Sequence, residues 1–110
     1  MAGLSNGVNR SIKKAMRINL RSNFVLPGLE GEESIEFDRS QITLREILEE
    51  LSRRAPIRIE YVRPGAKALD PDEWEVEVNG IPYQSCGAGL ETFLKDGDIV
   101  TIRILALGGG

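Results

Sequence analysis

The 110-residue chain contains no histidine and a single cysteine, Cys86. The lack of histidine excludes histidine-based acid–base catalysis and histidine-ligated metal sites. One cysteine cannot form a disulfide within the chain, and no cysteine or histidine lies beside Cys86 in the sequence to activate its thiol. We therefore expect Cys86 to be a partly buried, inert side chain in a reducing compartment, which favours a cytoplasmic location.

Long apolar runs and a strong charge of either sign are also missing. No stretch approaches the ~20 apolar residues that a membrane span needs, and residues 1–16 lack the apolar centre of a signal peptide. The net charge is -3 at pH 7 and the pI is about 5.0, so the molecule as a whole does not attract nucleic acids or anionic lipids. We expect no direct nucleic-acid partner and no membrane association.

The length and a hydrophobic fraction of 41% are typical of one soluble domain. We expect this domain to span residues 15–107. Residues 1–14 are small, polar and basic without periodicity, and we expect a flexible tail. That tail either has no role or docks to an acidic partner. A second flexible tail is expected at residues 108–110, where the sequence is three glycines.

Alternation of apolar and polar residues predicts several strands with one buried face. The clearest runs from Met16 to Arg21, and the strand from Trp74 to Val78 places Trp74 on the inner face. Asn79-Gly80 is a strong hairpin signal and leads to an edge strand that contains Pro82. The same alternation predicts strands at residues 34–38 and 57–61. Residues 90–94 are expected to form a short helical turn or a packed loop.

One helix is predicted with unusually complete signals. Thr43 is a natural N-cap, Glu46 completes a capping box, and Pro56 ends the helix. Its apolar residues share one face: Leu44, Ile47, Leu48 and Leu51. Two ion pairs are expected on the solvated face: Glu49–Arg53 and Glu50–Arg54.

The run from Ile99 to Leu107 is almost continuously apolar, which is typical of a buried strand at the centre of a sheet. We expect it to pair in parallel with the strand that begins at Met16, through a right-handed crossover that contains the helix. The predicted architecture is α+β, a ubiquitin-like β-grasp with a mixed sheet and one main helix packed on one face.

Three glycines, Gly108, Gly109 and Gly110, follow this last strand directly. Glycine has no Cβ, and four extended residues reach about 14 Å. Such a segment can enter a slot that any side chain would block. Because the sequence ends at Gly110, we expect its carboxylate to be the group on which another protein acts.

Residues 93–110 resemble the C-terminal signature of the bacterial and archaeal sulfur carriers, the family of the molybdopterin synthase small subunit and the thiamine sulfur carrier. The signature is a leucine, an Asp-Gly-Asp turn, an apolar strand and a terminal Gly-Gly. The matching residues are Leu94, Asp96, Gly97, Asp98, Val100, Ile102, Gly109 and Gly110. Residues 43–51 and 76–80 resemble the family helix and a preceding strand and turn. The chain departs from the pattern in its third glycine and in a longer segment 57–83.

The resemblance implies a carrier that is not itself an enzyme and holds no catalytic residue, metal or cofactor. An adenylating enzyme related to ubiquitin-activating enzymes would use ATP and magnesium on Gly110, and a sulfur donor would form the thiocarboxylate. The partners implied are that enzyme, the donor and an acceptor synthase subunit. Gly108, Gly109 and Gly110 would enter the partner's active site, and Leu105 and Leu107 would form the partner interface.

Three functions remain open at the level of sequence. The chain exceeds the short thiamine type, which favours the molybdopterin (molybdenum cofactor) pathway over sulfur transfer to thiamine, tRNA or an amino acid. A protein modifier joined to lysines through Gly110 is the alternative. The third is a β-grasp interaction module whose tail has no role.

Overall fold

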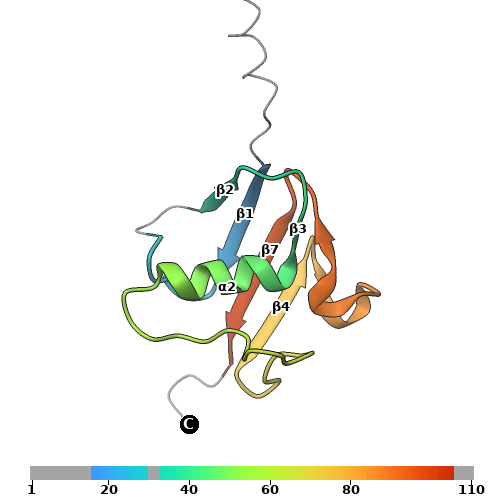
Figure 1. Ribbon diagram of the computed structural model, residues 1–110. Helices are drawn as coiled ribbons and strands as arrows, with labels where there is room; N and C mark the ends of the chain where they lie inside the picture. Colours follow the sequence, from blue (N-terminus) through green and yellow to red (C-terminus); the bar gives the residue numbers. More distant parts are fainter. Residues whose placement is uncertain (1–15, 30–32, 106–110) are drawn as a thin grey trace, which may run out of the picture.

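The computed structural model describes residues 16–29 and 33–105, and places a single α-helix, α2 (Leu44–Arg54), across one face of a mixed five-stranded sheet (Figure 1). The strand order is β2-β1-β7-β4-β5. A second sheet pairs β3 (Ile42–Thr43) with β6 (Phe93–Leu94). The strands of the main sheet are β1 (Met16–Ser22), β2 (Ser34–Phe37), β4 (Trp74–Val78), β5 (Ile81–Pro82) and β7 (Ile99–Ile104). The predicted α+β architecture is confirmed.

The last strand lies at the centre of the sheet, as the sequence predicted. β7 is parallel to β1, with Asn19 opposite Ile99, and antiparallel to β4, with Trp74 opposite Ile104. The predicted strand is too long, however, because β7 ends at Ile104 and Leu105 is already 48% exposed. Residues 106–107 lie outside the described part of the chain, as do the predicted tails at 1–14 and 108–110.

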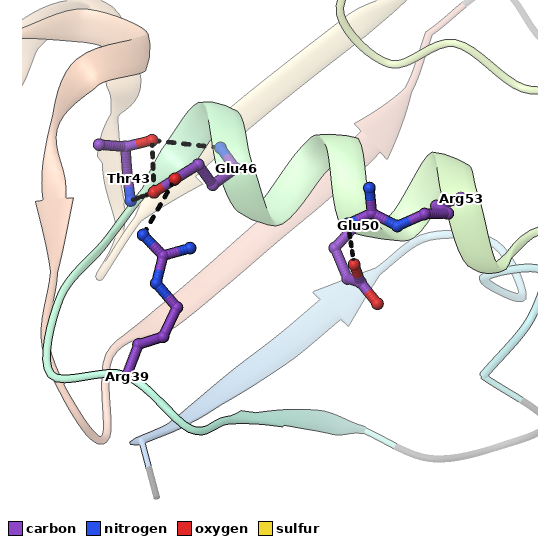
Figure 2. Close-up of polar contacts among 5 residues, drawn as sticks. All are labelled: Arg39, Thr43, Glu46, Glu50 and Arg53. Atoms are coloured by element: carbon purple, nitrogen blue, oxygen red, sulfur yellow. Dashed lines mark hydrogen bonds and ion pairs between the residues drawn. The ribbon is translucent and has the colours of Figure 1, made fainter.

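The start of α2 carries the predicted capping box (Figure 2). The Thr43 hydroxyl accepts a hydrogen bond from the Glu46 amide at 3.2 Å, and the Glu46 carboxylate accepts one from the Thr43 amide at 2.9 Å. Arg39 also contacts this carboxylate at 3.1 Å. The Thr43 amide is the main cause of a lowered Glu46 pKa. The helix ends where Ala55 turns to an extended conformation, as a residue before proline prefers.

The charged face of α2 differs from the expected pairing in one respect. Arg54 contacts Glu50 at 2.7 Å, as predicted, but Arg53 also turns to Glu50 in place of Glu49. Figure 2 shows the Glu50–Arg53 contact, one turn before the end of the helix. The Arg54 hydrogen bond is the first cause of a lowered Glu50 pKa.

The core forms where α2 meets the sheet. The four apolar helix residues predicted to share a face are fully buried and lie against inward side chains of β1, β4 and β7. Burial of each such side chain stabilises the fold by about 1.5–3 kcal/mol. The helix and the central strands therefore supply most of the apolar stabilisation.

The predicted strand at residues 57–61 is wrong, because this segment is an irregular connection from α2 to β4. The strands that pair with β4 are β7 and, at Glu77 and Val78 alone, β5, and residues 57–61 pair with none of the described strands. Its side chains do not share one buried face: Ile57 is 61% exposed, whereas Tyr61 is buried against Trp74 with ring centroids 4.8 Å apart.

Two short segments complete the fold. Residues Gly89–Glu91 form the predicted helical turn, of the 3-10 type, but Phe93–Leu94 form strand β6, which the sequence did not indicate. Cys86 is partly buried as expected, with its Sγ atom 3.6 Å from the Pro82 carbonyl oxygen. Within residues 16–29 and 33–105, no helix is long and apolar enough to span a membrane.

Candidate functional site

The end of β7 is held by hydrogen bonds from both sides. On the β4 side, the Leu105 amide donates to the Glu73 carbonyl oxygen at 2.8 Å. On the β1 side, the Asn23 side chain donates to the Ile104 carbonyl at 3.1 Å and accepts from the Ile104 amide at 2.9 Å. The backbone is thus fixed up to Leu105, the last residue that the structure describes.

Below this end of the strand, on the helix side of the sheet, lies a cluster of aromatic rings. Trp74, which is opposite Ile104 in the ladder, contacts Phe24 and Tyr61, with ring centroids 5.9 and 4.8 Å away. The Tyr61 hydroxyl is buried and has no hydrogen-bond partner among the described residues. Burial raises the pKa of Tyr61 to about 12. The end of β7 therefore rests on an apolar support.

The opposite face of the sheet is free of the helix and carries charged side chains near the end of β7. Arg103 contacts Glu77 at 3.0 Å and Glu75 at 3.3 Å, and the hydrogen bond that it donates to Glu77 is the first cause of a raised Arg103 pKa. Leu105, which directly follows β7 and lies two residues beyond Arg103, is 48% exposed. An exposed apolar side chain beside a charged network is typical of a protein contact surface.

The predicted site residues divide into two groups. Leu105 is exposed directly after β7, and its predicted role in a partner interface stays a prediction. Leu107, Gly108, Gly109 and Gly110 lie outside the described residues, so their predicted roles stay predictions. Asn23 and Glu73, which hold the end of the strand, were not predicted, because each is a polar residue next to a strand without any motif of its own.

The described residues offer a scaffold that presents a strand end. In the part of the chain that the structure covers, no three or more Asp, Glu, Cys or His side chains are grouped to hold a metal ion. The arrangement provides a central strand whose direction is fixed and whose continuation in sequence contains the three glycines.

Several solved structures share this fold. Urm1 from Trypanosoma brucei superposes with a TM-score of 0.61 at 22% identity, over 88% of this chain and 98% of that chain. A chain of the Amycolatopsis orientalis BexX/CysO complex gives 0.55 at 28%, over 84% and 99%. A Pyrococcus furiosus structure described as subunit 1 of a molybdopterin converting factor gives 0.57 at 22%, over 82% and 98%. No family model and no curated protein sequence matches the chain.

The sheet order, the single helix and these neighbours define a ubiquitin-like β-grasp protein. Within that class, the chain has the fold of the sulfur carriers typified by the molybdopterin synthase small subunit and the thiamine sulfur carrier, as the sequence predicted. The neighbours are small ubiquitin-like proteins that the present chain matches over nearly their whole length.

Proposed function

We propose that the protein is a sulfur carrier whose working group is the carboxylate of Gly110. An adenylating enzyme joins this carboxylate to AMP and releases pyrophosphate from ATP. A sulfur donor then displaces AMP and leaves a thiocarboxylate. The observation that supports this most directly is the central strand β7. Its backbone is held by hydrogen bonds as far as Leu105, and the sequence then continues into Gly108, Gly109 and Gly110.

The geometry of the strand end suits this role. Five residues follow Leu105, and a fully extended chain of that length reaches at most about 18 Å. Three of the five have no side chain, so they can pass through a slot that is narrower than any other residue requires. The carrier supplies position and reach, and the ATP and magnesium belong to the activating enzyme.

The proposed partners are the activating enzyme, a sulfur donor and an acceptor synthase subunit, all in the cytoplasm. The similar chain from the BexX/CysO complex is bound to a second protein, which agrees with a carrier that works by docking. Leu105 and Leu107 are proposed as the apolar part of that contact. We favour molybdenum cofactor biosynthesis as the pathway, supported by the fold shared with the Pyrococcus furiosus protein and by the chain length.

The test is the product formed at the C-terminus. The protein is incubated with an adenylating enzyme, ATP and a sulfur donor, and its intact mass is measured. We expect a gain equal to the replacement of one oxygen by sulfur, placed at Gly110 by fragmentation. Gly109→Val should abolish the product, because a branched Cβ cannot enter a glycine-sized slot.

The matched control is Ala68→Val, which also introduces a valine, but on an exposed loop, and should leave the yield unchanged. A ladder of lysine-linked species in cell extract, without any sulfur product, would support the modifier instead. If neither product forms with any adenylating enzyme from the same cell, the tail has no role and the proposal fails.

A further inference from the structure

Strand β7 extends beyond the point where its neighbour β1 stops. The parallel ladder between the two strands ends at Ser22 opposite Ile102, and the Ser22 hydroxyl then donates to the Phe24 carbonyl in the turn that follows. The backbone after Ser22 therefore leaves the sheet while β7 continues for two more residues. Ile104 would lack a partner on this side without a substitute for the missing strand.

The Asn23 side chain is that substitute. Its side-chain amide carries an NH2 donor and a carbonyl acceptor on one carbon, and both are used on the same residue: the nitrogen donates to the Ile104 carbonyl and the oxygen accepts from the Ile104 amide. An aspartate could make only the second bond, and an alanine neither. The side chain is exposed, so its removal leaves the core intact.

A second asparagine performs the corresponding role at the other end of β7. The Asn79 side-chain oxygen accepts from the Ile99 amide at 2.9 Å, and the Asn79 backbone N–H, rather than its side chain, donates to the Ile99 carbonyl at 2.8 Å. Asn79 thus fixes where β7 begins and Asn23 fixes where it ends. Only the end at Asn23 leads into the glycines, so the two residues form a natural pair of test and control.

We propose that Asn23 is a positioning residue for the reaction at Gly110: its two bonds to Ile104 set the point and direction at which the C-terminal segment leaves the domain. This inference rests on the proposed function. An activating enzyme that grips the domain and the terminal glycine together needs a fixed distance between them. With Asn23 in place, the backbone is fixed up to Leu105, so the distance to the terminal glycine is measured from that residue. Without Asn23, the strand end keeps the Leu105–Glu73 bond but loses its hold on the β1 side, so part of its ordering is deferred to the binding step, which weakens binding.

The first test measures the effect of the two Asn23–Ile104 hydrogen bonds in the isolated protein by amide hydrogen exchange. Asn23→Ala should speed exchange of the Ile104 amide roughly tenfold and leave Ile99 unchanged, because two local bonds are lost without global unfolding. Asn23→Asp should give an intermediate effect at Ile104. Asn79→Gly, which tolerates the positive φ of 53° at this position, should instead speed exchange at Ile99. Unchanged exchange at Ile104 in Asn23→Ala would overturn the inference.

The second test follows adenylation kinetics with the same variants at a temperature where all are folded. Asn23→Ala should raise KM about threefold to tenfold with kcat nearly unchanged, while Asn79→Gly should stay within about twofold of the natural protein. A similar KM change in both variants would reduce Asn23 to a structural role and overturn the inference. If the natural protein itself is not adenylated, the proposed function fails, and the exchange data still decide whether Asn23 fixes Ile104.

Discussion

Helix α2 and the end of β7 are held by different kinds of interaction. The helix buries four apolar side chains completely, whereas the end of β7, beside a half-exposed Leu105, makes hydrogen bonds to one exposed side chain and one backbone carbonyl. Apolar burial contributes several kcal/mol per side chain, while an exposed hydrogen bond contributes about 1 kcal/mol or less. The helix side therefore supplies most of the stability, and the strand end is the part that we propose presents the C-terminal segment to its partners.

The largest effect is expected where the helix meets the sheet. Leu48→Ala should lower the free energy of unfolding by about 2–5 kcal/mol, because Leu48 is fully buried in the core. Leu105→Ala removes the same atoms from a residue that is 48% exposed and should cost much less. Chemical denaturation of both variants checks the comparison, and equal losses would break it.

A smaller effect is expected at the other end of the helix. Gly28 has a φ of +89°, and a Cβ built there would lie 2.3 Å from the Arg54 carbonyl oxygen. Gly28→Ala should therefore cost about 1–3 kcal/mol from backbone strain, plus the clash. Gly65→Ala is the matched control, because Gly65 has a φ of +78° with open space around it. The difference in midpoint of denaturation between the two variants isolates the close approach of the loop to α2. A Gly28→Ala midpoint no lower than that of Gly65→Ala would contradict it.

A still smaller effect concerns pH and the capping box. The pKa values of Glu46 and Glu50 are lowered in the folded protein, so the stabilisation from both is present above their unfolded pKa values. That stabilisation is lost as the pH falls through the lower folded values. Glu46→Gln should keep the box geometry but flatten the loss of stability below about pH 4. Thermal melting from pH 7 to pH 3 checks this, and an unchanged acid slope in the variant would contradict it.

Much of the fold could be predicted from sequence because its signals are local. The alternation that begins at Met16, the capping box at Thr43 and the apolar run from Ile99 each specify one element, and all three elements are present, although the last ends at Ile104. The strand predicted at residues 57–61 failed because alternation reports which side chains can be buried, and not whether a partner strand is available.

The site could be predicted only in part for a related reason. Leu105 is exposed because β7 stops at Ile104, before the end that the sequence predicted, and its role as a partner contact stays a prediction. The bonds between Asn23 and Ile104 join residues 81 positions apart. No local pattern reports such a contact, because it exists only after β1 and β7 have paired and the chain has turned away at Ser22.

The central claim is that stability and function are carried by separate parts of the molecule. It is tested most directly by deleting Gly109 and Gly110 and measuring adenylate formation by pyrophosphate release, with the free energy of unfolding measured on the same sample. We expect adenylation to be lost while stability changes by less than about 0.5 kcal/mol, because the deleted residues have no side chains to pack. Adenylation at the rate of the intact chain, or a loss of several kcal/mol in stability, would contradict the account.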